Sequence, residues 1–143
     1  MLLNECINFK LNRLSKMVSR YFTEKLIASD VTPVQYSVLK CLWQKDFQAP
    51  SQIAQTLSLD SSSLTGLLDR MESKGLLKRI PDSGDRRAIQ VILTPQGKAL
   101  EQPIEKLIDE ANVEVLQSLI KKDKIQLIKF LDKIADNPPF SKS

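Results

Sequence analysis

Residues 59–97 decide the fold of this chain and read LDSSSLTGLLDRMESKGLLKRIPDSGDRRAIQVILTPQG. Three pieces follow one another within this stretch. The spacing of the apolar residues predicts a helix over Ser61–Lys74 and a short strand over Leu77–Ile80. A turn over Pro81–Arg87 then leads into a second strand over Ala88–Leu93. The predicted order is therefore helix, strand, basic turn and strand.

The predicted helix has start and stop signals. Asp60 and Ser61 are good N-cap residues, because a side-chain oxygen there can accept from the unpaired backbone N–H groups of the first turn. Gly75 is placed to end the helix in a left-handed conformation, which glycine adopts without strain. The apolar residues recur at helical spacing and form one inward face: Leu64, Leu67, Leu68 and Met71.

The outward face of this helix carries small hydroxyl groups near its start, at Ser62, Ser63 and Thr65, and charge further along, at Asp69 and Arg70. A helix that enters a DNA major groove needs small residues, because bulky side chains hold its backbone away from the base edges. Taken alone, a solvent-exposed helix face is the simpler interpretation. The hairpin that follows changes that balance.

The two strands are expected to form a hairpin. Its turn, residues 81–85, is rich in turn-forming residues and is followed by Arg86 and Arg87. A groove-reading helix followed by a hairpin with arginines at its tip is typical of a winged helix, whose wing can reach the electronegative minor groove. Because neighbouring strand residues point to opposite faces, one arginine can pair with Asp85 while the other extends toward DNA.

This chain resembles the MarR family of bacterial transcriptional regulators. The residues that carry the resemblance are SQIAQTLSLDSSSLTGLLDRMESKGLLKR at 51–79, Asp85-Arg86-Arg87 in the wing, and LTPQGKAL at 93–100. Two positions depart from the family pattern. Ser58 stands where the helix-turn-helix turn usually has glycine, and Gly66 stands where many members have an arginine that meets phosphate or base.

The resemblance implies a mostly α (α+β) fold: one winged helix-turn-helix domain over residues 1–143. Residues 30–97 would form the DNA-binding lobe, and residues 1–29 and 98–137 a helical dimerisation lobe. It further implies a homodimeric repressor that binds a pseudo-palindromic operator in double-stranded DNA, with Arg87 the wing arginine assigned to the minor groove. The expected DNA-binding residues are Ser51, Ser61, Ser62, Ser63, Thr65, Arg70, Lys74, Asp85, Arg86 and Arg87.

The flanking segments predict further helices. An apolar stripe favours a first helix from about Asn4 to Ile27, and Thr32-Pro33 has the N-cap and first-turn residues of the next. Ser51 is expected to cap a short supporting helix over Gln52–Leu57, and the connection before it, residues 47–50, to pair with the wing.

After the wing, Thr94-Pro95 repeats the cap signal, and a long helix with a kink or late start at Pro103 is expected. A break at Lys121–Asp123 is predicted to precede a last helix. The first and the last two helices carry apolar stripes but lie far apart in sequence, so a joint bundle built by two chains is the simplest way to bury them.

Composition narrows the function classes. The chain has 143 residues and a net charge of +4, and residues 61–98 hold seven basic but only four acidic groups, as a DNA-binding region would. No apolar run of 18 residues and no signal-peptide pattern occurs, and the two cysteines lack framework spacing. These features favour the cytoplasm and no membrane partner.

The sequence lacks histidine-based catalysis and the common catalytic motifs. The chain has no histidine and only four glycines, with no phosphate-binding loop and no cysteine pair at metal-ligand spacing. Neither an enzyme, nor a cofactor, nor a metal site is therefore expected. Members of the resembled family that sense metals use histidine-containing sites, which disfavours that branch.

Two kinds of effector stay open. Resembled proteins bind small lipophilic or aromatic acids between their two lobes, and Arg13, Arg20 and Tyr36 are the candidate ligand-binding residues, although a solvated face explains the arginines equally simply. Peroxide-sensing members carry a reactive cysteine near the start of the first helix, where Cys6 lies, so a thiol-based redox sensor is an alternative. A second alternative is a winged helix that binds proteins and has no operator.

Overall fold

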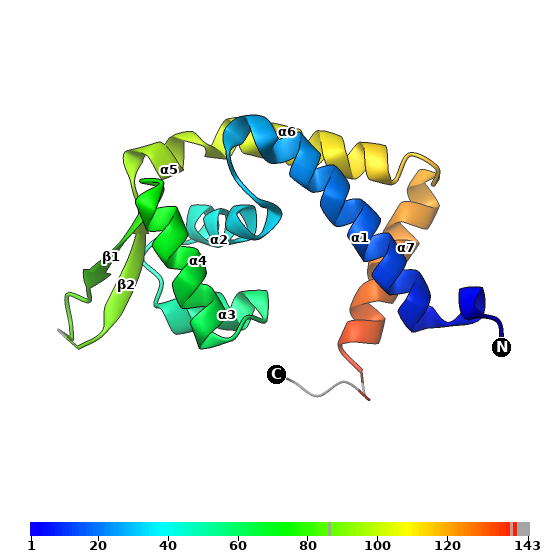
Figure 1. Cartoon of the computed structure of the whole chain (residues 1–143), viewed down its shortest axis with the longest axis horizontal. Coiled ribbons are helices and arrows are strands. Elements are labelled where there is room, and N and C mark those ends of the chain that lie inside the picture. The colour runs from blue at the N-terminus through cyan, green and yellow to red at the C-terminus, as the bar shows by residue number, and fades with distance from the viewer. Residues whose placement is uncertain (86, 138, 140–143) are drawn as a thin grey trace.

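The computed structural model describes residues 1–85, 87–137 and 139, and its fold is mostly α with one small antiparallel sheet (Figure 1). The elements in chain order are η1 Leu3–Glu5, α1 Ile7–Leu26, η2 Ile27–Ser29, α2 Pro33–Gln44, α3 Pro50–Leu57, α4 Ser61–Ser73, β1 Leu77–Pro81, β2 Ile89–Leu93, α5 Pro95–Ala99, α6 Glu101–Val115 and α7 Lys121–Ala135. The predicted winged-helix order, with helix α4 followed by the hairpin, is confirmed.

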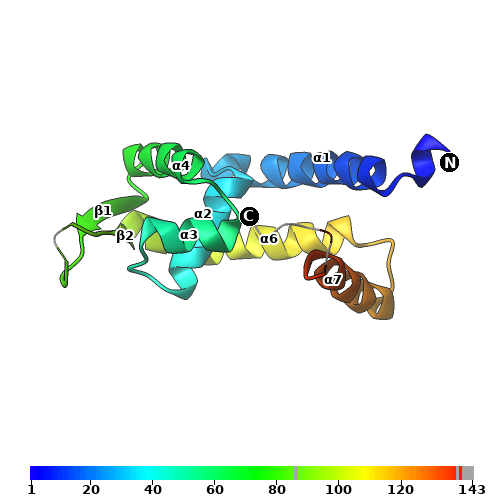
Figure 2. The ribbon, with the colours of Figure 1, turned by 90° about the horizontal axis from the view of Figure 1, so that it is seen from below.

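The elements are arranged at two ends of an elongated molecule. Helices α2, α3 and α4 and the hairpin occupy one end, and α1, α6 and α7 extend to the other (Figures 1 and 2). Helix α1 packs along α6, and α5 contacts β2 and thereby joins the two ends. Helix α7 contains no buried residue and packs only weakly on the rest of the described chain.

Both predicted threonine caps, at the starts of α2 and α5, are confirmed. Thr32 accepts from the Gln35 N–H at 3.2 Å, and the Gln35 side chain accepts from the Thr32 N–H at 3.1 Å, which is a complete capping box. Thr94 accepts from the Gly97 N–H at 3.1 Å. A proline at the first helical position follows each cap, as predicted.

The predicted cap at Ser51 was wrong. Helix α3 begins at Pro50, its N-cap is Ala49, and Ser51 lies inside the first turn. Proline has φ fixed near the helical value and lacks the N–H that a cap would have to satisfy, so it sets the start one residue earlier than the serine. The Gln52 side chain accepts from the Ala49 N–H at 2.9 Å and completes this helix start.

The C-terminal helices differ from prediction in one respect. A break at Leu100 separates α5 from α6, so that Pro103 lies in the first turn of α6, which confirms the expected late start. The predicted break at Lys121–Asp123 was wrong, because these residues form the first turn of α7 and the chain turns at residues 116–120 instead. Charged residues are compatible with an exposed helix start, so charge alone did not mark a boundary there.

The core lies at the winged end of the molecule. The two strands pair in antiparallel register from Leu77 opposite Leu93 to Pro81 opposite Ile89. Gln48 pairs with Val91 on the other edge of β2 through two backbone hydrogen bonds of 2.8 and 3.3 Å, which confirms the predicted pairing of that connection. The most deeply buried side chains include Leu26, Val38, Leu39, Leu42, Ile53, Leu64, Leu68, Met71, Leu77, Val91 and Ile104.

Two glycines are required by the backbone. Gly75 has φ +75° and ends α4, as predicted. At Gly97 an added Cβ would lie 2.1 Å from the Leu76 carbonyl oxygen, so only glycine lets α5 approach the start of β1 this closely. Over the described part of the chain, every helix is too short or too polar to cross a membrane.

Candidate nucleic-acid interface

The start of α4 is held by the carboxylate of Asp60. Its oxygens accept from the Ser63 N–H at 2.7 Å, the Ser63 hydroxyl at 2.8 Å and the Ser62 hydroxyl at 2.9 Å. Hydrogen bonding from the Ser63 N–H, followed by the two hydroxyls, lowers the pKa of Asp60 to about 2. The carboxylate is therefore charged at neutral pH and favourably placed at the positive end of the helix dipole.

The predicted outward face of α4 is exposed. Ser61, Ser62, Ser63 and Thr65 all lie on the surface. The Thr65 hydroxyl donates to the Ser61 carbonyl at 2.8 Å, and the hydroxyls of Ser62 and Ser63 donate to Asp60. Each hydroxyl therefore keeps lone pairs free to accept a hydrogen bond from another molecule.

Gly66 extends the surface of small side chains at the start of α4, called smooth below for that reason. An added Cβ would meet the Arg70 Nη1 at 3.5 Å, which is ordinary contact, so the fold itself does not require glycine at this position. The exposed Arg70 guanidinium lies beside the space that a side chain at position 66 would occupy. The smooth start of α4 thus adjoins a cation one turn further along.

The helix-turn-helix turn places α3 against α4. Ser58 has φ +53°, the left-handed conformation that explains why glycine is usual here, and the Leu59 N–H donates to the Ala54 carbonyl at 2.9 Å. Ile53 is fully buried between the helices. Ser51 is exposed on α3, so it is available to a partner although it is not the cap.

The wing tip is ordered by two side-chain turns. The Gly84 N–H donates to Asp82 Oδ1 at 2.9 Å, and the Arg87 N–H donates to Asp85 Oδ1 at 2.9 Å. Arg87 is exposed, and the hairpin that carries it projects from the same end of the molecule as α4 (Figure 1). Arg86, for which a pairing with Asp85 was considered, lies outside the described residues.

Lys74 has partners within its own chain. Its ammonium donates to the Asp30 carbonyl at 2.6 Å and to Gln35 Oε1 at 3.1 Å, and lies 3.4 Å from Asp30 Oδ1. These contacts tie the end of α4 to the connection between α1 and α2. The structure therefore gives this lysine a packing role instead of an outward position.

A residue that sequence reasoning missed is Arg79 on β1. Its guanidinium donates to Glu72 at 2.8 and 3.1 Å and to Asp69, both on α4. Hydrogen bonding to Glu72, and then to Asp69, raises the pKa of Arg79. Two acidic residues three positions apart on a helix, with an arginine on the following strand, would have been a usable signal.

The three candidate effector residues have different surroundings. Arg13 lines a groove along α1 with Lys10 and three apolar side chains. Arg20 is exposed and pairs with Glu24 at 3.5 Å, one helical turn away. Tyr36 lies on α2, tilted against Trp43 with ring centroids 6.2 Å apart, and burial raises its pKa.

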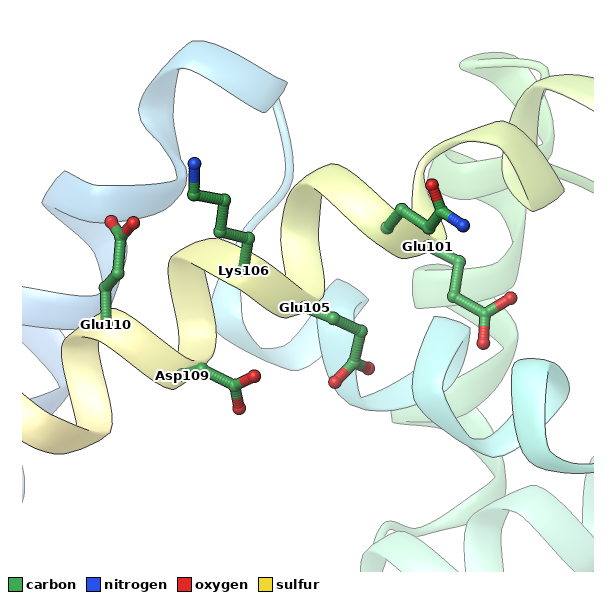
Figure 3. A pocket seen from close by; sticks show the side chains of 6 residues that line it. Glu101, Glu105, Lys106, Asp109 and Glu110 are labelled. Atoms are coloured by element: carbon green, nitrogen blue, oxygen red, sulfur yellow. The ribbon is translucent and has the colours of Figure 1, made fainter.

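A second groove runs along α6 and is mostly acidic (Figure 3). Lys40 of α2 donates to Glu105 on this helix at 2.7 Å, and this hydrogen bond raises the pKa of Lys40. The excess of carboxylates makes this groove unsuited to an anionic effector. Its lining residues are Glu101, Gln102, Glu105, Lys106, Asp109 and Glu110.

The two cysteines differ in access. Cys41 is buried in α2, and burial raises the pKa of its thiol, which confirms it as a core residue. Cys6 is partly exposed at the N-cap of α1. Among residues 1–85 and 87–137, no group of three or more possible metal ligands comes together.

The exposed start of α4, the supporting helix α3 and the arginine-bearing hairpin define a winged helix-turn-helix protein. A sequence model of the MarR family matches residues 31–89. The multiple antibiotic resistance protein MarR of Escherichia coli (strain K12) is 31% identical over 134 residues, which are 91% of this chain and 92% of that protein. This chain belongs to the MarR family, whose members are transcriptional regulators and not enzymes.

Two solved structures resemble the whole chain. A cysteine-to-serine mutant of MarR from E. coli, complexed with operator DNA, has a TM-score of 0.85 at 28% identity and covers 94% of this chain and 98% of its own. CouR from Rhodococcus jostii RHA1 bound to p-coumaroyl-CoA has a TM-score of 0.83 at 25% identity and covers 99% of both chains. One relative is thus solved with DNA and one with a small acyl thioester.

Proposed function

We propose that this chain is a DNA-binding repressor that acts as a homodimer on a pseudo-palindromic operator and is released by a small lipophilic effector. In this proposal residues 30–97 bind DNA, and residues 1–29 and 98–137 form the dimer lobe. The observation that carries the proposal is the shared position of the smooth, exposed start of α4 and the Arg87-bearing wing at one end of the molecule (Figure 1).

The proposed mode of DNA binding follows from the dimensions of these elements. A helix with Ser62, Ser63 and Thr65 outward is slim enough to approach base edges in the major groove. The wing arginine suits the adjacent minor groove. Two copies related by two-fold symmetry would meet half-sites about one helical turn apart, and the operator-bound MarR of E. coli is a family precedent.

The proposed dimer is supported by apolar residues exposed at the end far from the wing. On α1 these are Ile7, Leu11, Leu14 and Met17, and on α7 they are Ile125, Ile128, Phe130, Leu131 and Ile134. Soluble monomers rarely expose apolar surface of this extent. A second copy would cover these faces and give α7 the packing that it lacks within one chain.

The proposed effector is a small lipophilic compound that carries an acid or an activated acyl group, as the p-coumaroyl-CoA bound to CouR does. The groove along α1, with Arg13 and Lys10 beside apolar side chains, has the matching chemistry. An effector that changes the separation of the two recognition helices by a few ångströms would weaken the match to sites about 34 Å apart. As a regulator of chromosomal DNA the protein would act in the cytoplasm.

The test is binding to the DNA just upstream of this coding region. Fluorescence anisotropy should give a Kd at least about a thousandfold lower for that fragment than for a scrambled one at 0.15 M salt. Thr65→Leu should weaken specific binding and leave non-specific binding nearly unchanged, because phosphate contacts carry no sequence information. Equal affinity for both DNAs in the wild-type protein would favour the protein-interaction alternative.

A further inference from the structure

The hairpin is tied to the recognition helix by an ion cluster. Arg79 of β1 holds Glu72 through its Nε at 3.1 Å and its Nη2 at 2.8 Å, and the same Nη2 donates to Asp69. The two carboxylates lie one helical turn apart on α4. One guanidinium therefore spans a full turn of the recognition helix, a planar fork geometry that a lysine cannot reproduce.

Arg79 lies in the middle of the hairpin, so the ion cluster connects α4 to a part of the hairpin beyond its base. Residues Leu77 and Leu93 fix the base of the hairpin in the core, and Arg79 lies two residues further toward the tip, opposite Val91. Val91 is held on its other side by Gln48. The middle of the hairpin is thus held from both sides, by α4 through Arg79 and by the chain before α3 through Gln48.

The energetics suit an orienting role better than a stabilising one. The Arg79 side chain is 27% exposed and those of Asp69 and Glu72 are 58% and 37% exposed. Ion pairs this accessible contribute little to the stability of the fold. The buried base of the hairpin and the buried Val91 can hold the fold without them, whereas Pro81 and Ile89, nearer the tip, are exposed.

We propose that Arg79 is a positioning residue, which sets the angle of the wing relative to α4 so that Arg87 and the start of α4 engage one DNA duplex together. This inference rests on the proposed DNA binding. Arg79 itself does not need to touch DNA for this role, because its Nε and Nη2 already donate to α4. Its loss should uncouple the wing from the recognition helix while both stay folded.

The experiment compares Arg79→Met with Lys78→Met. Both variants remove one positive charge from β1. Lys78 is exposed, and because it precedes Arg79 on the strand, its side chain points to the opposite face of the hairpin. Amide hydrogen exchange is measured first in the free protein. Arg79→Met should speed exchange of the hairpin amides by about tenfold or more and leave those of α2 unchanged, whereas Lys78→Met should change neither.

Operator binding is then measured for these variants with and without Arg87→Ala. Arg79→Met should raise the operator Kd by about tenfold, and the penalty of Arg87→Ala should shrink to under about threefold in its presence, because a misplaced wing no longer delivers that arginine. In the Lys78→Met background the Arg87→Ala penalty should keep its full size. If Arg79→Met proves poorly folded, Glu72→Gln offers a milder disruption of the same cluster.

A triple variant separates positioning from charge neutralisation. Asp69→Asn, Glu72→Gln and Arg79→Met together remove every charge of the cluster, and operator binding should stay weak. Recovery of wild-type affinity would overturn the inference, since Arg79 would then only mask the carboxylates. Unchanged hairpin exchange, or a full Arg87→Ala penalty in the Arg79→Met protein, would also overturn it. Wild-type protein that fails to prefer its operator would instead refute the proposed function. The exchange data on the free protein would still show whether Arg79 holds the hairpin against α4.

Discussion

The two ends of this molecule differ in how far they bury their apolar side chains. At the winged end, side chains from α2, α3, α4 and the hairpin bury one another, and caps and tight turns satisfy the backbone. At the far end, α1 and α7 leave large apolar side chains on the surface, and α7 buries none. The winged end packs its core within one chain, whereas the helical end leaves apolar faces that the proposed second chain would cover.

The largest effect should come from charge placed in the far end. Leu11→Asp combined with Leu131→Asp should abolish the dimer and destabilise the protein by on the order of 4 kcal/mol or more per chain, because each carboxylate would be desolvated in the interface. Both leucines are 44% exposed in one chain, so the same changes would cost little in a stable monomer. The control is Val34→Asp, because Val34 is 41% exposed, to a similar degree, but lies at the winged end.

Sedimentation equilibrium and thermal melting measure this pair of changes. The double variant should run as a monomer with a greatly lowered Tm, while Val34→Asp should keep the wild-type mass and stability. A wild-type protein that is folded, monomeric and competent to bind DNA at micromolar concentration would show that the exposed apolar faces need no partner.

Overpacking the winged end should be the next largest effect. Gly97→Ala would place a methyl group 2.1 Å from the Leu76 carbonyl oxygen, so α5 must move off β1 at a cost of about 3 kcal/mol in the free energy of unfolding. Gly84→Ala is the matched control, because its nearest neighbour would be an Asp82 oxygen at 3.8 Å. Urea denaturation should find the control within about 0.5 kcal/mol of wild type, and equal losses would mean that the contact at Gly97 relaxes freely.

Removing the wing arginine should affect binding and leave folding intact. Arg87→Ala should weaken operator binding by about 1–3 kcal/mol and reduce the salt slope by about two units in a dimer with two wings, one for each lost phosphate-region contact. The exposed position of this residue predicts an unchanged Tm. Operator affinity equal to wild type across a salt titration would move the assignment to Arg86 or to α4 alone.

Relieving backbone strain should stabilise the winged end slightly. Ser58 has φ +53°, which glycine adopts at no steric cost, so Ser58→Gly should add about 0.5–1 kcal/mol. Gln55→Gly, inside the neighbouring helix α3, should lose about 1 kcal/mol and serves as the control of opposite sign. Denaturation curves in which both variants lose stability would mean that Ser58 makes an offsetting interaction.

The smallest expected effect is a pH dependence at the start of α4. The pKa of Asp60 is lowered from 3.8 to about 2 by its hydrogen bonds, so its stabilising contribution is present above about pH 4 and is lost as the pH falls toward 2. The difference in Tm between wild type and Asp60→Asn should therefore shrink on acidification. Carbon NMR of the carboxyl group checks the assignment, and an Asp60 pKa near 4 would contradict it.

The sequence predicted the winged end better than the far end because its signals are local. Asp60, Thr32 and Thr94 each act within a few residues, and the alternation of β2 is read directly. Ser51 failed as a cap because Pro50 was the stronger start signal. The Arg79 cluster was missed because it joins a helix and a strand whose packing angle no local pattern specifies.

The effector residues show the same limit. Arg13, Arg20 and Tyr36 were chosen from the resemblance, yet their relative positions depend on how α1 and α2 pack. Arg20 pairs with Glu24 one helical turn away, and the Tyr36 ring packs against Trp43. Residues far apart in sequence can be brought together only by tertiary contacts, and for the groove beside Arg13 these include the proposed second chain.

The pairing of Gln48 with Val91 also bears on how the protein behaves when concentrated. A two-stranded sheet has two free edges, and each exposes N–H and C=O groups that can recruit a strand from another molecule. On the outer edge of β2, Gln48 takes both backbone groups of Val91, and the Asp46 carboxylate accepts from the Leu93 N–H at 3.0 Å. A connection of a few residues therefore shields this edge of the hairpin from aggregation by strand addition while leaving its tip open to solvent.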